Sequence, residues 1–265
     1  RLETREIVGV EALCRLRSET GKVLAAETFL EATSDAHIAE ELTDRMLSIV
    51  AEDLRCWLDD GIPVQHVGIN VSTADFYTGN LMPMLKASFD RAGVSLDHLI
   101  LEVNEDVYMG RRDKVAERQM KLLREGGIRV ALDNFGTGFA SLTRLRDVPV
   151  DIIKIDRSFI ARLWPEDPSM VIVQGLIDIA RQLNIRVVAE GIEAEVQASQ
   201  LWSMGCRLGQ GFAFSKPLDR VAIAELLKRH SQGIAGAIPL QLESDAAHHR
   251  PVADGNFDFQ LTGTG

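Results

Sequence analysis

The sequence predicts an α/β barrel, in which parallel strands are enclosed by helices. The chain has 265 residues, and a single barrel of alternating strands and helices usually runs to about 250 residues. The hydrophobic fraction is 46% but the aromatic fraction is only 6%, so the core is mainly aliphatic, as is typical of strands buried on both faces. Short β-rich runs also alternate with amphipathic stretches along most of the chain.

Seven short runs have the composition of buried strands. They are Ile7–Leu13, Val67–Val71, Leu99–Val103, Ile128–Leu132, Ile152–Ile155, Arg186–Ala189 and, more weakly, Cys206–Gln210. A closed barrel of this type has about eight strands, so one strand would precede Arg1 or escape the pattern. An open doubly wound sheet is the alternative, although no GxGxxG motif follows the first run, which makes a dinucleotide-binding fold less favourable.

Amphipathic stretches between these runs predict the helices. They are Ile38–Leu58, Met82–Ala92, Lys114–Glu125, Met170–Leu183 and Glu195–Met204, and a further helix is expected at Asp219–Arg229. Gly126-Gly127 and Gly205 stand where helix C-terminal stops belong.

The composition divides the chain into a main domain, residues 1–230, and a C-terminal tail, residues 231–265. From Ser231 onward the sequence shifts to Gly, Ala and polar residues. The tail is either linker-like or a packed extension, and some alternation over Asn256–Leu261 keeps the second interpretation open. Because the sequence begins at Arg1 without Met, we expect a fragment whose upstream modules are unknown.

Charge and cysteine content narrow the class of protein. The net charge of -10 argues against a broad basic surface for a nucleic acid polymer, and a compact anionic ligand would need local cations such as metals. Cys14, Cys56 and Cys206 are odd in number and form no CxxC pair, which indicates a reduced, cytoplasmic domain. No apolar run reaches the roughly 18–20 residues of a membrane span.

Polar residues recur at the ends of the predicted strands, where a buried strand has no need of them. They are Glu11, Asn70, Glu102, Glu105, Asp133, Asn134, Lys154, Asp156, Glu190 and Gln210. In an α/β barrel these ends meet on one face. Carboxylates that close raise one another's pKa, and a divalent cation relieves the conflict. An all-oxygen donor set suits Mg²⁺ or Mn²⁺ rather than zinc.

The stretch Phe135–Phe139 follows two of these polar residues and carries two glycines. Glycine permits positive φ angles and a mobile loop. The segment is either an ordinary turn between strand and helix or a lid over the metal site.

These motifs together resemble the EAL family of cyclic di-GMP phosphodiesterases. The signature triplet stands as Glu11-Ala12-Leu13, and it is followed in order by GINVS, LEVNE, LDNFGTGFASL, VDIIKIDRSFI, VVAEGIE and GQGFAFSKPL. The matches cover roughly residues 5–220. The resemblance implies a TIM-like barrel whose first strand runs antiparallel to the others.

The resemblance also implies roles for individual residues. Glu11, Asn70, Glu102 and Asp133 match the family's metal ligands, with Asp133 bridging two cations. Glu190 and Lys154 match residues that position or activate the attacking water, and Glu105 matches a glutamate that holds the loop after the fourth strand. Arg15 matches a contact to the ligand phosphate. Asp156, Phe212 and Pro217 match residues of the ligand pocket, and Glu193 and Gln210 match further polar residues of the site.

The sequence departs from the family pattern in three places. Asn134 replaces the second of two aspartates, and its neutral amide oxygen is a poorer ligand for a hard cation, so the second metal would bind more weakly. Asn104 replaces a threonine between the paired glutamates. The family's opening strand, with its Gln-Pro segment, has no match in residues 1–6.

Three functions remain open at this stage. The first is metal-dependent hydrolysis of cyclic di-GMP to linear pGpG by two Mg²⁺ or Mn²⁺ ions. The second is a degenerate EAL domain that binds cyclic di-GMP as a receptor, which Asn134 favours. The third is an unrelated metal-dependent barrel enzyme. The resemblance further implies a homodimer and an upstream GGDEF or sensory module.

Overall fold

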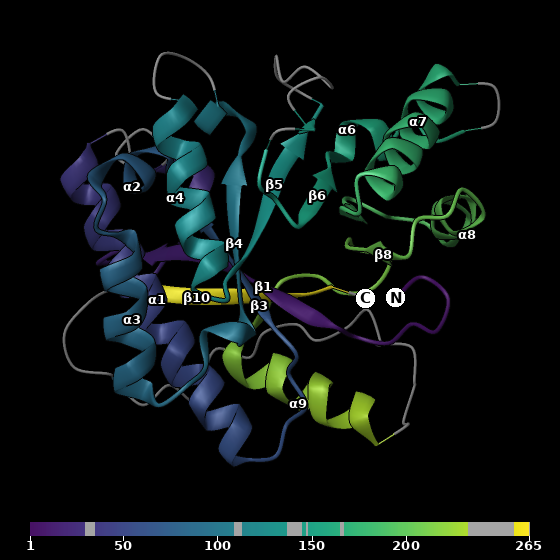
Figure 1. Ribbon diagram of the computed structural model, residues 1–265. Helices are drawn as coiled ribbons and strands as arrows, with labels where there is room; N and C mark the ends of the chain where they lie inside the picture. Colours follow the sequence, from purple (N-terminus) through teal and green to yellow (C-terminus); the bar gives the residue numbers. More distant parts are fainter. Residues whose placement is uncertain are drawn as a thin grey trace.

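The computed structural model of this chain describes residues 1–29, 35–108, 113–136, 145–146, 148–164, 167–232 and 257–264. A curved sheet forms its centre, and the helices lie around the outside (Figure 1). The predicted class, an α/β fold of the barrel type, is confirmed.

Seven strands of the sheet are parallel and follow one another in the order of the sequence. They are β1 (Gly9–Arg17), β3 (Val67–Val71), β4 (Leu99–Asn104), β5 (Arg129–Phe135), β6 (Ile152–Ile155), β7 (Arg186–Ala189) and β8 (Leu208–Gly209). Each lies at a run predicted from composition, and β3, β6 and β7 have the predicted bounds. A short strand, β2 (Val23–Ala25), pairs antiparallel with the end of β1.

The reversed strand comes from the C-terminal tail. Strand β10 (Phe257–Thr264) pairs antiparallel with β1 from Gly9 to Leu16 and also with β9 (Leu218–Asp219), so it lies along β1 in Figure 1. The family's reversed opening strand has no match in residues 1–6, and β1, which carries Glu11, is parallel to β3. The hydrogen-bonded path ends at β8 and β9, so the curled sheet is an incomplete barrel in the residues that the structure describes.

Eight α-helices surround the sheet in the described part of the chain. They are α1 (Ala36–Asp59), α2 (Thr73–Thr78), α3 (Leu81–Ala92), α4 (Asp113–Glu125), α6 (Arg157–Ile160), α7 (Pro168–Gln182), α8 (Glu195–Ser203) and α9 (Arg220–Ser231). Three 3-10 turns, Ala26–Thr28, Leu96–His98 and Glu105–Tyr108, complete the list. Within these residues, no helix is both long enough and apolar enough to cross a membrane.

Side-chain caps explain where several helices begin. Asp35 accepts hydrogen bonds from the first amides of α1, and Asp219 does the same for α9. Ser72 and Asp75 form a reciprocal capping box at α2. Such caps satisfy amides that have no partner inside the helix, so these polar residues fix the points at which the three helices begin.

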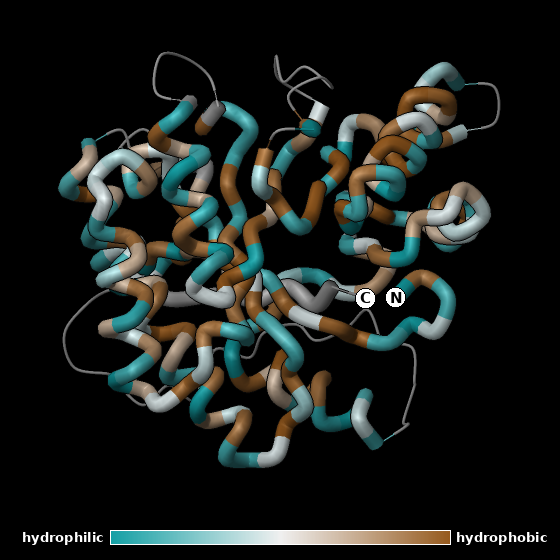
Figure 2. The backbone as a smooth tube through the Cα atoms, viewed as in Figure 1, coloured by the Kyte–Doolittle hydropathy of each residue, from teal (hydrophilic) through white to brown (hydrophobic). Residues whose placement is uncertain are grey.

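Two hydrophobic clusters hold the sheet and helices together. The main core lies between the outer face of the strands and the helices, and includes the fully buried Leu47, Leu54 and Phe89. In Figure 2 the hydrophobic colour is concentrated along the strands and on parts of the helices. A separate cluster of Ile100, Ala131 and Ile152, with Val188 against it, is an apolar layer inside the curl of the sheet, as expected when alternate residues of each strand point inward.

Asp53 is a buried acid in α1 whose charge weakens the fold. Its side chain is 7% exposed, and its Oδ1 lies 3.1 Å from Nη2 of the more exposed Arg220 in α9. Burial raises the pKa of Asp53 from 3.8 to about 6, although Arg220 opposes the shift. Because the folded-state pKa is the higher one, the stability that Asp53 contributes falls as pH rises from about 4 to about 6, and stays low above that.

We therefore expect Asp53→Asn to stabilise the chain at pH 7 by about 1–3 kcal/mol. The gain should shrink toward zero near pH 4, where wild-type Asp53 is already protonated. Urea unfolding at pH 4, 5, 6 and 7 measures the difference. Asp44→Asn, at an exposed position of the same helix, is the matched control and should change little. A variant less stable than wild type at pH 7 would mean that the ion pair with Arg220 outweighs burial.

Candidate functional site

The polar residues predicted at the strand ends are brought together by the curl of the sheet. Glu11 comes from β1, Asn70 from β3, Glu102 from β4, Asp133 from β5 and Lys154 from β6. Glu190 follows β7 and Gln210 follows β8. Glu11, Glu102, Asp133 and Lys154 are buried. We call these seven residues the acidic cluster.

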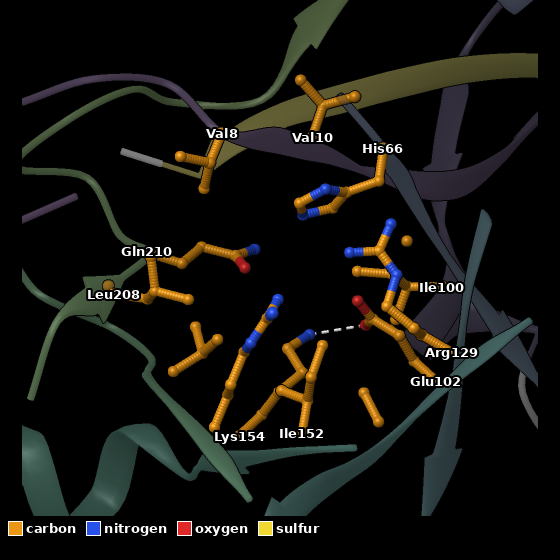
Figure 3. A pocket seen from close by; sticks show the side chains of 15 residues that line it. Val8, Val10, His66, Ile100, Glu102, Arg129, Ile152, Lys154, Leu208 and Gln210 are labelled. Atoms are coloured by element: carbon orange, nitrogen blue, oxygen red, sulfur yellow. Dashed lines mark hydrogen bonds and ion pairs between the residues drawn. The ribbon is translucent and has the colours of Figure 1, made fainter. Parts of the chain in front are cut away.

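The Lys154 ammonium group is at the centre of the acidic cluster. Its Nζ lies 2.5 Å from Glu102 Oε2, 2.8 Å from Glu190 Oε1, 3.1 Å from Glu11 Oε2 and 3.5 Å from Asp133 Oδ1. The Lys154 side chain is 4% exposed. Figure 3 shows its contact with Glu102 as a dashed line. One cation therefore faces four acids in a largely buried site.

The excess of acids over cations, together with burial, shifts the pKa values of Lys154, Glu102 and Glu190. Burial would lower the pKa of Lys154, but the surrounding carboxylates hold it well above its usual value. Burial and the charge of Glu11 raise the pKa of Glu102 well above its usual range. Burial also raises the pKa of Glu190 to about 7, against the opposing effect of Lys154. If all four acids are ionised, the cluster carries more negative charge than Lys154 neutralises. Otherwise at least one of the acids retains its proton.

Glu11 is the acid that the protein keeps ionised. Burial favours its neutral form, but Lys154 and three hydrogen bonds outweigh burial and lower its pKa. Asn70 Nδ2 donates to Glu11 Oε1 at 2.7 Å, and Gln210 Nε2 donates to Oε2 at 2.6 Å. Hydrogen bonds to a charged acceptor are stronger than neutral ones, so these amides fix the carboxylate in one orientation.

Asn134 lies at an irregularity of β5. The pairing of β5 with β6 shifts register between Leu132 and Phe135, and Asn134 has a positive φ of 53°. Asn and Asp adopt this left-handed conformation more readily than other side chains. Asn134 Nδ2 donates to Asp133 Oδ2 at 3.0 Å. The bulge thus turns the Asn134 amide back toward the acid before it.

Glu105 contacts the start of the glycine-containing loop. Its buried carboxylate accepts a hydrogen bond from the Gly136 amide through Oε2, at 3.1 Å. Gly136 has a φ of 98°, which suits glycine. Residues 137–144 lie outside the described part of the chain, so the prediction of a lid over Phe135–Phe139 falls mostly outside it as well.

The other residues predicted to contact the ligand make no hydrogen bond or ion pair with Lys154 in the part of the chain that the structure describes. Arg15 is half-buried and donates to the Cys14 carbonyl at 2.9 Å. Asp156 caps α6 by accepting from the Ser158 amide. Phe212 is 58% exposed, Pro217 is half-buried and Glu193 is exposed. These side chains can contact a ligand at the surface, because none of them forms an ion pair with Lys154 within the described residues.

The acidic cluster fits divalent cations in its chemistry. Its donors are oxygens, and Asp133 Oδ1 is buried with no hydrogen-bond partner in the described chain. Among the described residues, no three His, Cys, Asp or Glu side chains are grouped as ligands of one ion, and the Lys154 ammonium lies among the acids. A hard cation would take over part of the charge compensation that Lys154 provides alone.

Sequence reasoning missed the basic residues at the opposite ends of the same strands. His66, Arg129 and Arg186 stand four residues before Asn70, Asp133 and Glu190. Since alternate residues of a strand share a face, counting back in steps of two would have placed them inside the curl as well. The alternation over Asn256–Leu261 was a weak signal for strand β10 (Phe257–Thr264), but nothing local in the sequence indicated that β10 pairs with β1.

The fold and the acidic cluster define an α/β barrel protein with its polar site at the carboxyl ends of the strands. The family model described as EAL domain matches residues 1–217, and the chain therefore belongs to the EAL domain family.

Individual relatives agree with this assignment. The chain is 33% identical to the cyclic di-GMP phosphodiesterase NbdA of Pseudomonas aeruginosa over 225 residues, which is 85% of the chain but 29% of NbdA. It is similar to the structure of the PaMucR phosphodiesterase in complex with c-di-GMP, with a TM-score of 0.73 and 31% identity over 79% of this chain and 84% of that one. The EAL enzyme Bd1971, with cAMP and cyclic di-GMP bound, gives a TM-score of 0.79 at 27% identity, over 85% of this chain and 62% of that one.

Proposed function

We propose that this chain hydrolyses cyclic di-GMP to linear pGpG with the help of Mg²⁺ or Mn²⁺. The observation that carries the proposal is the acidic cluster, in which Glu11, Glu102, Asp133 and Glu190 surround Lys154. The phosphodiesterase relatives and the c-di-GMP complex of a related structure support the choice of substrate.

Glu190 and Lys154 have the properties that the chemical step needs. A general base works best when its pKa lies near the working pH, and the pKa of Glu190 is raised to about 7. Glu190 would accept a proton from the attacking water. Lys154, held in its charged form, would offset the negative charge that develops on the phosphoryl oxygens.

Glu11, Asn70, Glu102 and Asp133 would hold the cations, and Asn134 would contribute a neutral oxygen to the second one. Bound Mg²⁺ or Mn²⁺ would polarise the phosphodiester and lower the pKa of water beside it. Arg15 would contact a ligand phosphate, and Asp156, Phe212 and Pro217 would border the nucleotide. Glu105 would fix the start of the loop through Gly136.

The direct test is to incubate the chain with cyclic di-GMP and either Mg²⁺ or Mn²⁺ and to separate the nucleotides. We expect pGpG to accumulate with metal and not with a chelator. Binding of cyclic di-GMP without any pGpG under either metal would contradict the proposal. It would favour the second candidate, a receptor, for which Asn134 is the supporting observation.

Asn134→Asp should lower the Mg²⁺ concentration that gives half-maximal hydrolysis by about tenfold or more. A carboxylate attracts a hard cation more strongly than an amide does, and Asp tolerates the positive φ at this position. Rates measured against Mg²⁺ concentration give the shift. Asn184→Asp is the matched control, because Asn184 also has a positive φ, of 57°, but is exposed beyond the end of α7. An unchanged metal dependence would mean that residue 134 does not contact the metal.

A further inference from the structure

The interior of the curled sheet contains a second polar group, at the end opposite the acidic cluster. A cavity inside the curl has about 580 Å³ of space outside protein atoms, part of it open to solvent. Glu102 and Lys154 line one end of the cavity, and His66, Arg129 and Arg186 line the other. In Figure 3 the labelled His66 and Arg129 side chains point into this space. We call these three residues the basic end.

The basic end is formed where strands begin. His66 directly precedes β3, Arg129 is the first residue of β5 and Arg186 is the first residue of β7. In β5 and β7, Ala131 and Val188 of the apolar layer lie two residues after Arg129 and Arg186. The basic end is therefore distinct from the acidic cluster, which lies at the strand carboxyl ends beyond this layer.

The positive charge of the basic end is only partly neutralised. Arg129 Nη2 donates to the backbone carbonyl of Asp97 at 2.8 Å. The Arg186 guanidinium has no hydrogen-bond or ion-pair partner in the described chain, although the Arg186 backbone amide donates to the Asp151 carbonyl. The acids that influence Arg129 are Asp151 and Asp97. The Asp151 carboxylate already accepts hydrogen bonds from Arg124 and from the Val130 amide.

The positive charges of Arg129 and Arg186 also affect the ionisation of His66. Burial and the positive charges of Arg129, Arg186 and His98 together lower its pKa to about 4. Its ring occupies space that Gly9 leaves open, since a Cβ on Gly9 would lie 2.5 Å from His66 Cδ2. At neutral pH the ring is uncharged, so it presents one N–H donor beside two guanidinium groups.

We propose that His66, Arg129 and Arg186 bind a phosphate group in this cavity. Two guanidinium groups balance the charge of a phosphate dianion, and each can donate two parallel hydrogen bonds to its oxygens. The neutral imidazole supplies a further donor. The phosphate is either the free inorganic ion or the terminal group of a phosphate monoester. This proposal is independent of the function assigned to the acidic cluster.

Titration of the whole chain tests the proposal in the presence of a chelator, so that no metal at the acidic cluster attracts the anion. Isothermal titration calorimetry with inorganic phosphate should show saturable binding that equal ionic strength of chloride does not reproduce. Arg186→Gln should weaken phosphate binding by at least about tenfold. Arg118→Gln, at an exposed position of α4, should bind as wild type does. No saturable binding, or equal binding by Arg186→Gln, would overturn the proposal.

A second readout needs no variant. An anion next to an imidazole favours its protonated form, so phosphate should raise the pKa of His66, which NMR of the ring protons follows. An unchanged His66 pKa at saturating phosphate would overturn the proposal. Parallel titrations with AMP identify the source: equal affinity indicates recognition of the phosphate group alone, and tighter binding of AMP indicates a nucleotide monoester.

Discussion

Glu11→Gln is expected to reduce hydrolysis of cyclic di-GMP by at least about 10²–10³-fold while the chain stays folded. Glu11 accepts hydrogen bonds from Asn70, Gln210 and Lys154, and its pKa is lowered, so it is the acid that the cluster holds ionised. Glutamine keeps the shape but removes the charge that a divalent cation requires. The rate of pGpG release at saturating Mg²⁺ measures the loss.

The controls distinguish a loss of catalytic activity from a loss of folding. Glu52→Gln changes an exposed acid in α1 and should retain wild-type activity and thermal stability. Circular dichroism of Glu11→Gln should show the wild-type helix content, and Glu11→Ala should be equally inactive. If either Glu11 variant hydrolyses cyclic di-GMP at the wild-type rate, Glu11 does not hold a metal and the role assigned to the acidic cluster is wrong.

Most of the parallel strands could be predicted from the sequence because each is a short aliphatic run bounded by polar residues. Val67–Val71 and Ile152–Ile155 are examples in which the predicted bounds match the structure. The side chains that converge could also be predicted, since Glu102 and Lys154 stand at the carboxyl ends of strands that a barrel brings together.

The remaining features depend on contacts between distant parts of the chain. Strand β10 lies in a tail of Gly, Ala and polar residues, and its antiparallel partner Gly9–Leu16 is about as far away in the sequence as the chain allows. The pairing depends on a vacant edge beside β1, which local composition does not reveal. The bulge at Asn134 likewise arises from the pairing of β5 with β6, and not from the residue type alone.

Lys154→Met should destabilise the chain at neutral pH by about 3–5 kcal/mol and abolish hydrolysis. Removing one partner of a buried ion pair leaves the other charges uncompensated, and here four carboxylates lie within 3.5 Å of the Lys154 ammonium. Methionine has a similar length, so the loss comes from charge more than from volume. Urea unfolding at pH 7.5 measures it. Lys228→Met, which breaks the exposed pair with Asp60, should cost far less because exposed ion pairs contribute little.

The pH dependence of Lys154→Met shows whether charge is the cause. Without Lys154, the pKa values of Glu11, Glu102 and Glu190 in the folded state should rise above those in the unfolded chain. The folded variant then binds more protons, so its stability should increase as pH falls from 7.5 to 5 and decrease as pH rises. Added Mg²⁺ should restore part of the stability at pH 7.5, since a bound cation replaces the missing charge. A deficit that neither acid nor Mg²⁺ reduces would indicate that Lys154 matters for packing, and that the acids do not form a cation site.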